Sequence, residues 1–142
     1  MRIVINSDPK LLNILRGVVR YRAQEMGFSE ADAEALALAV NEAATNVMRH
    51  TYVNQHAARL SLEVLNFPDR MEFFLEDSGP KVRAEAIQPR PLEEVRPGGL
   101  GVHFIRRVMD VCAYDEEFGG GNRLKMTKYL PRKVSACDET AN

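Results

Sequence analysis

The feature that most constrains this chain is a row of polar residues inside an otherwise apolar helical segment. Residues 36–52 read LALAVNEAATNVMRHTY and contain strong helix formers but neither Gly nor Pro. Within this segment Glu42, Asn46 and His50 recur at every fourth position, and residues four apart lie along one face of an α-helix. Apolar residues lie one turn before this row and on the opposite side: Leu36, Leu38, Val40, Ala43 and Val47.

A helix that is apolar on two sides is buried between layers of a domain. We therefore expect the three polar side chains to face a cavity, where a carboxylate, an amide and an imidazole suit a metal and a phosphorylated ligand. The simpler alternative is a solvated row on an ordinary surface helix, because short patterns recur by chance.

Composition favours one soluble domain of ordinary charge. The chain has 142 residues, of which 45% are hydrophobic and 27% charged, with a net charge of −1. This balance gives no support to a nucleic-acid partner. No apolar run approaches the ~20 residues of a membrane span, and the N-terminus turns polar too early for a secretory signal. Two cysteines without a CxxC pattern indicate reduced thiols and no structural zinc, so we expect a cytoplasmic protein without a membrane partner.

Hydrophobic periodicity predicts the element order β, α, α, β, β, loop, α, β, β. A short strand at 2–6 precedes a helix at 9–26, which Asp8 caps and Gly27 ends, and Ser29 caps the central helix. Alternating residues predict a hairpin of strands at 59–64 and 70–75. A third helix carries an apolar face of Leu100, Phe104, Val108 and Val111, and a last hairpin pairs 112–118 with 122–130.

This order indicates an α+β fold, a two-layer α/β sandwich in which a mixed, mostly antiparallel sheet carries its helices on one face. We expect a single domain over 1–131 and a flexible C-terminal tail over 132–142. Between 80 and 97 the periodicity breaks down and four of the chain's seven prolines gather, which is typical of a loop that is either functional or disordered.

Three local features follow one another along this fold. They are the row of Glu42, Asn46 and His50, the Asp77-Ser78-Gly79 run at the end of a strand, and the Gly98-Gly99-Leu100-Gly101 run that opens a helix. Together they resemble the N box and the two glycine boxes of the GHKL ATP-binding superfamily (Bergerat fold). The run NEAATNVMRHTY most resembles the bacterial anti-sigma-factor serine kinases, and the resemblance extends from about residue 2 to residue 130.

The chemistry of the helix row agrees with this resemblance. The side-chain oxygen of Asn46 suits Mg²⁺ when phosphates supply the other ligands. Glu42, one turn earlier, can accept a proton from an incoming hydroxyl or orient it, and the family assigns these two roles to the matching positions. Alternatively, Glu42 pairs with Arg49 or another basic group. His50 either touches a phosphate or caps the end of the helix.

The other two boxes suit the base and the phosphates. A buried Asp77 can accept a hydrogen bond from the amino group of adenine, as the family's matching aspartate does, and Gly79 lets the backbone approach the base. The alternative for Asp77 is an ordinary turn residue. Gly98, Gly99 and Gly101, with Leu100 between them, open a helix whose free N–H groups can bind phosphate, or they form a hinge of the 80–97 loop, which the resemblance makes an ATP lid.

Positive charge in this loop adds to the phosphate site. Among its basic residues Arg96 is the best candidate for a phosphate contact because it adjoins the glycine box. The others, Lys81, Arg83 and Arg90, are more simply solvated. The chain departs from the family pattern at Lys81, where the first glycine box often has a second glycine, and at Pro97 and Gly98, which follow Arg96.

The resemblance implies an ATP- and Mg²⁺-dependent protein-serine/threonine kinase that doubles as an anti-sigma factor. It would phosphorylate a STAS-domain anti-sigma factor antagonist on serine, hold a sigma factor when that antagonist is released, and pair into a homodimer. An alternative is a nucleotide-gated protein-binding switch with little kinase activity. A third hypothesis is a detached sensor-kinase catalytic domain, although His50, His56 and His103 all lie within the ATP-binding fold and not on a separate dimerisation helix.

Overall fold

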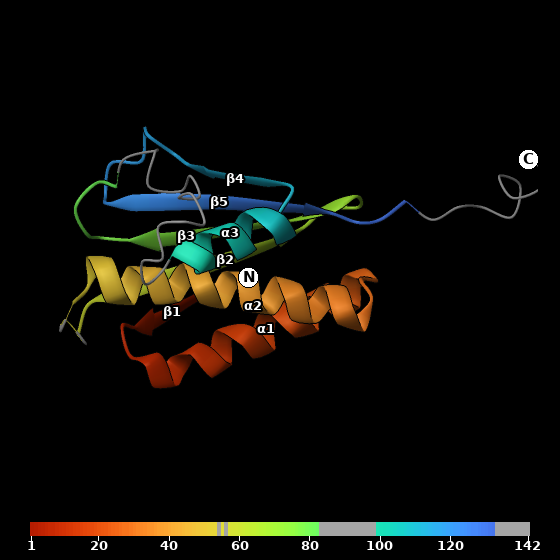
Figure 1. The fold of residues 1–142 in the computed structure, drawn as a ribbon, viewed down its shortest axis with the longest axis horizontal. Coiled ribbons are helices and arrows are strands. Elements are labelled where there is room, and N and C mark those ends of the chain that lie inside the picture. The colour runs from red at the N-terminus through yellow and green to blue at the C-terminus, as the bar shows by residue number, and fades with distance from the viewer. Residues whose placement is uncertain (54, 56, 83–98, 133–142) are drawn as a thin grey trace, which may run out of the picture.

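The protein is a five-stranded sheet with three helices side by side on one face (Figure 1). The computed structural model describes residues 1–53, 55, 57–82 and 99–132. The strands follow the order β1-β2-β3-β5-β4, and each neighbouring pair is antiparallel. Their bounds are β1 (Arg2–Asn6), β2 (Arg59–Asn66), β3 (Arg70–Asp77), β4 (Val111–Tyr114) and β5 (Asn122–Tyr129). The predicted two-layer α+β sandwich is confirmed, and β1 lies at one edge of the sheet.

The helices begin and end largely at the residues that the sequence predicts. They are the 3₁₀ turn η1 (Pro9–Leu11), α1 (Leu12–Met26), α2 (Glu30–Asn46), the π-helical turn η2 (Val47–Thr51) and α3 (Gly99–Val108). Asp8 accepts a hydrogen bond from the Lys10 amide at 3.0 Å, and Ser29 accepts one from the Asp32 amide at 3.1 Å. Gly27 ends α1 with a φ of 100°, a left-handed conformation that favours glycine.

The core lies between the helix layer and the inner face of the sheet. Helix α2 packs against both α1 and α3, and seven of its residues are buried: Ala33, Leu36, Ala37, Ala39, Val40, Ala43 and Ala44. From the sheet, Leu62, Phe73 and Met126 are fully buried beneath these helices. The five buried alanines of α2 let its backbone approach its neighbours closely, which fixes the direction in which its remaining side chains point.

The structure corrects several predicted boundaries. Strands β2 and β3 each extend two residues beyond the predicted hairpin, to Asn66 and Asp77. Helix α3 ends at Val108, and Val111 lies in β4, because the Asp110 amide donates to the carbonyl of Thr127 and draws the chain into the sheet. Strand β4 ends at Tyr114 instead of residue 118, since Asp115 begins a turn in which its carbonyl accepts from the Phe118 amide at 3.2 Å. Strand β5 ends at Tyr129, one residue early. Most of the predicted 80–97 lid, and residues 133–142 of the tail, lie outside the described residues.

The end of the central helix differs from a regular α-helix. Residues Val47–Thr51 form a π-helical turn, and the Tyr52 amide donates to the Val47 carbonyl five residues earlier at 2.9 Å. Such a turn contains one residue more than an α-helical turn and is frequent at functional sites. The fourfold row of polar residues therefore loses its alignment after Asn46, a change that helix propensity does not predict.

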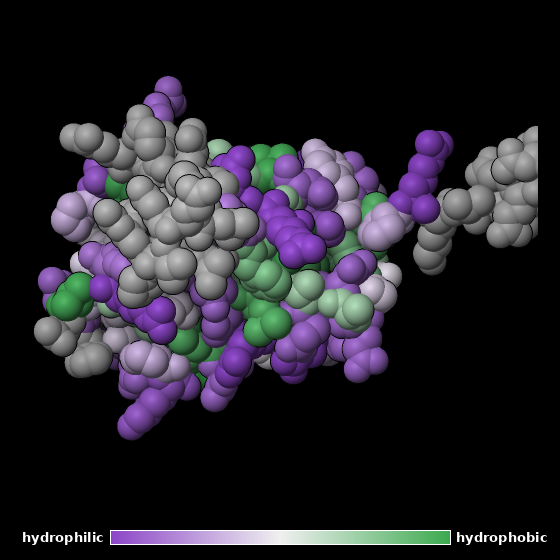
Figure 2. Space-filling model, viewed as in Figure 1, coloured by the Kyte–Doolittle hydropathy of each residue, from purple (hydrophilic) through white to green (hydrophobic). Residues whose placement is uncertain are grey.

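The helix-bearing surface is mostly hydrophilic, with apolar side chains gathered over the α2 and α3 region (Figure 2). Leu38, which lies one turn before Glu42 on the same face of the central helix, is 37% exposed. The expectation that this face of the helix is buried is therefore wrong at Leu38. No helix within the described part of the chain is long and apolar enough to cross a membrane.

Two leucines two positions apart on α2 test this arrangement. Leu36→Ala should lower the free energy of unfolding by about 2–5 kcal/mol, because the side chain is fully buried and leaves a cavity. Leu38→Ala, at a 37% exposed position, should cost less than about 1 kcal/mol. Urea denaturation of both variants measures the difference; equal losses would contradict the observed rotation of α2.

Candidate functional site

Two polar side chains of α2, Glu42 and Asn46, form the centre of the candidate site. Both are half-buried, they lie one turn apart, and neither has a hydrogen-bond or ion-pair partner among the described residues. The first turn of α3 lies directly against Glu42: a Cβ added to Gly101 would be only 2.6 Å from its Oε2. The absence of a side chain at Gly101 therefore makes room for the Glu42 carboxylate beside the start of α3.

The beginning of α3 has the composition of an anion-binding turn. Gly99 and Leu100 occupy its first two positions and Gly101 the third. The first N–H groups of a helix have no partner within the helix, and the helix dipole places partial positive charge there. This places Gly101 of the second glycine box next to Glu42, one helical turn before Asn46. Arg96 and Gly98 of the predicted site lie outside the described residues.

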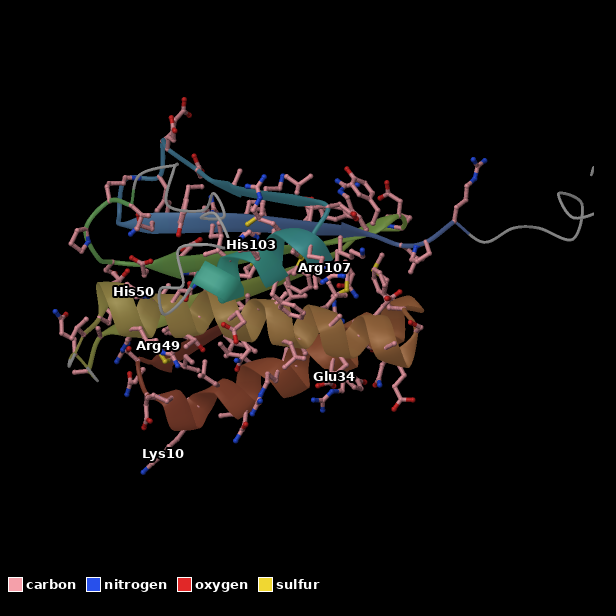
Figure 3. The ribbon with its side chains drawn as sticks, viewed as in Figure 1. Lys10, Glu34, Arg49, His50, His103 and Arg107 are labelled. Carbon is pink, nitrogen blue, oxygen red and sulfur yellow. The ribbon has the colours of Figure 1, made fainter. Side chains whose placement is uncertain are left out.

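The residues after Asn46 are arranged differently from the prediction. Arg49 and His50 are both exposed in the π-helical turn, and Figure 3 shows His50 on the side of α2 nearer to β3 and Arg49 on the side nearer to α1. No ion pair joins Arg49 to Glu42 among the described residues. The alternative prediction, that Glu42 pairs with Arg49, is therefore wrong. A phosphate contact by His50 stays a prediction. Because His50 is exposed, the row of inward-facing side chains on the central helix ends before this residue.

The third predicted element, Asp77, lies at the end of β3 and is only 6% exposed. Its Oδ1 accepts hydrogen bonds from the Gly79 amide and from Nδ2 of Asn122, both at 2.9 Å. Every hydrogen bond to this carboxylate within the described residues goes to Oδ1, which leaves Oδ2 as an acceptor for a ligand. The first bond also closes the turn that the sequence allows as an alternative, so Asp77 is a turn residue and a buried acceptor at once.

Tyr52 connects the end of the central helix to the end of β3. Its buried hydroxyl accepts from the Ser78 amide at 2.5 Å and donates to the Arg59 carbonyl at 2.9 Å. A Cβ on Gly79 would overlap the side-chain methyl of Thr51, so the glycine permits this close contact. The helix that carries Asn46 and the strand that carries Asp77 are thereby held together.

Sequence reasoning missed four residues of this corner: Tyr52, Tyr114, Gly121 and Asn122. Gly121 has a φ of 141°, and a Cβ there would overlap the carbonyl of Asp77, so only glycine fits. The predicted hairpin of 112–118 with 122–130 leaves a turn at 119–121, whose three residues are all glycines, but nothing local indicated that Gly121 contacts Asp77. Asn122 and Asp77 meet because β3 and β5 pair in that register.

Burial and charge set the ionisation of Tyr114 near this corner. Desolvation, and after it the negative charges of Asp77 and Cys112, raise the pKa of Tyr114 to about 12. Tyr114 therefore keeps its hydroxyl proton at neutral pH, where it is available as a hydrogen-bond donor.

A metal ion would find few protein ligands here. The described part of the chain holds no group of three or more His, Cys, Asp or Glu side chains close enough to share a metal. An amide oxygen on Asn46 suits a hard cation that takes its remaining ligands from phosphates and water, which is how Mg²⁺ commonly binds. The donor set thus fits Mg²⁺ carried by a nucleotide and does not fit a protein-only metal cage.

Comparisons with known proteins agree with this geometry. A family profile described as histidine kinase-like ATPase domain matches residues 5–128. Serine-protein kinase RsbW of Listeria monocytogenes is 33% identical over 136 residues, which cover 89% of this chain and 85% of the relative. Serine-protein kinase RsbW of Bacillus subtilis is 27% identical over 134 residues, which cover 89% of this chain and 82% of the relative.

Solved structures share the fold at lower identity. The RsbU and RsbW domains of Rv1364c from Mycobacterium tuberculosis match with a TM-score of 0.62 and 15% identity, covering 95% of this chain and 34% of that one. A histidine kinase domain from Erythrobacter litoralis EL346 matches with a TM-score of 0.54 and 15% identity, covering 87% of this chain and 60% of that one. At this identity the likeness concerns the fold alone.

The charge of Asp77 should be measurable through Tyr114. Asp77→Asn should lower the pKa of Tyr114 from about 12, because it removes a negative charge that disfavours the tyrosinate. Ultraviolet absorbance against pH reports the tyrosinate, and Tyr114→Phe identifies which part of the signal is its own. In the wild type, Tyr114 should favour folding fully below pH 10.0 and lose that contribution as pH rises to about 12, since the unfolded tyrosine ionises first. An unchanged titration in Asp77→Asn would contradict the proximity.

Proposed function

Because the chain belongs to the histidine kinase-like ATPase domain family and to the RsbW serine-protein kinases, we propose that it transfers the terminal phosphoryl group of ATP to a serine of a STAS-domain anti-sigma factor antagonist. ATP binding and serine-protein kinase activity are the properties of that family. The antagonist, a sigma factor held in alternation with it, a homodimer and a cytoplasmic location are the further parts of the proposal.

The observation that carries the proposal is that Glu42 and Asn46 are half-buried and have no partner among the described residues, with Glu42 directly against the first turn of α3. Because neither side chain is used in a hydrogen bond or ion pair with another described residue, and both are only half-buried, both are available to a ligand. Phosphates bound at the N–H groups of α3 would lie within the same neighbourhood, since Gly101 lies against Glu42. The adenine would lie at the end of β3, where Oδ2 of Asp77 can accept from its amino group.

In the transfer step, the serine Oγ attacks the terminal phosphorus in line with the bond to ADP. The Oγ–P bond forms, the bond between that phosphorus and the bridging oxygen of ADP breaks, and the serine proton passes to the Glu42 carboxylate and then to water. Asn46 would hold Mg²⁺, which when bound neutralises charge on the phosphate oxygens. The remaining work of the site is to position the two reactants and to exclude water.

Glu42→Gln tests the catalytic role with almost no change of shape. Phosphotransfer should slow by about 10²–10⁴-fold, because the amide cannot accept the serine proton, whereas ATP affinity should change little. An extract of the source cells with terminal-phosphate-labelled ATP and Mg²⁺ would reveal an acid-stable labelled protein band. Glu34→Gln is the matched control, since Glu34 is an exposed glutamate of the same helix that pairs with Arg20.

Two outcomes would change the assignment. A Glu42→Gln variant as active as the wild type would exclude Glu42 as the base. Wild-type protein that binds Mg-ATP but labels no protein in the extract would favour the nucleotide-gated binding switch instead of a kinase.

Gly101→Ala separates catalysis from stability at the same place. The new methyl group would displace the Glu42 carboxylate, so phosphotransfer should fall by at least about tenfold. The melting temperature should not fall, because the obstructing atom ends a flexible side chain and alanine favours a helix by about 0.5–1 kcal/mol over glycine. Gly17→Ala in α1 is the control, since no atom lies within 4 Å of its added Cβ; it should keep full activity. Full activity of Gly101→Ala would show that the position of Glu42 does not matter.

A further inference from the structure

Asn122, at the start of β5, forms the most completely bonded polar cluster near the site. It is 3% exposed, and its Nδ2 donates to Oδ1 of Asp77 at 2.9 Å and to the Pro80 carbonyl at 2.8 Å. Its own Oδ1 accepts from the Val82 amide at 2.7 Å. The orientation of the amide follows from its partners, because a carboxylate and a carbonyl only accept whereas a backbone N–H only donates.

These bonds limit what the Asp77 carboxylate can do. Its Oδ1 receives two donors, Asn122 Nδ2 and the Gly79 amide, which fix the rotation of the carboxylate plane. Oδ2 is then held in one direction with no donor among the described residues. A fixed acceptor discriminates between purines: a 6-amino group donates to it, whereas a 6-oxo group opposes it with another acceptor.

The backbone next to Asn122 is built for this contact. Gly121, with a φ of 141°, has no room for a Cβ because the Asp77 carbonyl occupies that space. The chain at Gly121 can therefore lie against the end of β3, where Asp77 pairs with Asn122 of the neighbouring strand β5 (Figure 1). The close approach places the Asn122 amide within reach of Asp77 and of the two backbone groups at 80 and 82.

We propose that Asn122 is the positioning residue for purine selectivity, which holds the Asp77 carboxylate and the turn at 78–82 as one unit so that Oδ2 meets a 6-amino group. This inference rests on the proposed function, in which Asp77 binds the base of ATP. Asn122 itself does not touch the nucleotide; it acts through Asp77.

Asn122→Asp is the most informative variant because it keeps the shape of the side chain and replaces the Nδ2 donor with a carboxylate oxygen, which adds a negative charge. It places a second carboxylate beside Asp77, where the Nδ2–Oδ1 distance is now 2.9 Å. Two carboxylates so close repel each other when both are ionised, so at lower pH the pair binds one proton. That proton forms a hydrogen bond between the new carboxyl group of the variant and Asp77, in place of the bond from Asn122 Nδ2. ATP binding should therefore weaken by about 10–100-fold at pH 8 and recover partly at pH 6, as expected for a lost charge-assisted bond.

The measurement is the dissociation constant of Mg-ATP and of Mg-GTP by calorimetry at several pH values, with wild type and variant in parallel. Other titratable or charged groups at this corner are Tyr114 from β4, Tyr52, and Lys81, whose Nζ donates to the Phe118 carbonyl. These groups are common to both proteins, so the ratio between them isolates position 122. Asn66→Asp is the matched control at the far end of the sheet, where Asn66 is exposed.

The inference predicts that the ATP preference over GTP falls by about tenfold or more in Asn122→Asp, and that it returns as pH is lowered, with no such change in Asn66→Asp. An unchanged preference with no dependence on pH would overturn it and leave Asn122 as a structural tie. If Asn122→Asp does not fold, Asn122→Ser, which keeps a single hydroxyl donor, should show a smaller loss of preference, and an unaltered preference would again overturn the inference.

The wild type separates this inference from the proposed function. A wild type that binds ATP and GTP equally would contradict the role of Asp77 itself, whatever position 122 does. A wild type that prefers ATP, together with an Asn122→Asp variant that keeps that preference at every pH, would contradict only the role of Asn122.

Discussion

The burial of α2 between α1, α3 and the sheet is the constraint on which the rest of the structure depends. Seven of its residues are buried, and five of those are alanines that allow neighbouring backbones to approach closely. A helix enclosed in this way cannot rotate, so the polar residues on its one less covered side have a fixed direction. Glu42 is held against the start of α3, and Asn46 one helical turn further along α2, by the packing of residues that take no part in the proposed chemistry.

A second set of contacts relates this helix to the other half of the site. Tyr52 binds the backbone of Ser78, and Thr51 packs where a side chain on Gly79 would lie. The end of β3, with Asp77, is bound in turn to β5 through Asn122. Groups that come from three separate parts of the chain are therefore held at constant separation, which a site needs if it is to bind both ends of one extended ligand.

Local patterns predicted most of the fold because each has a direct physical cause. The caps at Asp8 and Ser29, the glycine that ends α1 and the alternation in β2 and β3 depend on neighbouring residues alone. The fourfold row likewise located Glu42 and Asn46. The features that local patterns could not predict depend on partners distant in the sequence. Asn122 contacts Asp77 only because β3 and β5 pair in the register that places the two residues opposite each other. Val111 lies in a strand because the amide of its neighbour Asp110 donates to the carbonyl of Thr127.

Because residues Val47–Thr51 form a π-helical turn, the number of residues between Asn46 and Tyr52 determines the geometry of this site. A turn of this kind holds one residue more than the α-helix it interrupts. Removing any one of these residues would let the helix continue regularly and would rotate the residues after it by about 100°, taking Tyr52 away from Ser78. Relatives of this protein should therefore vary in the identity of the residues between Asn46 and Tyr52 far more freely than in their number.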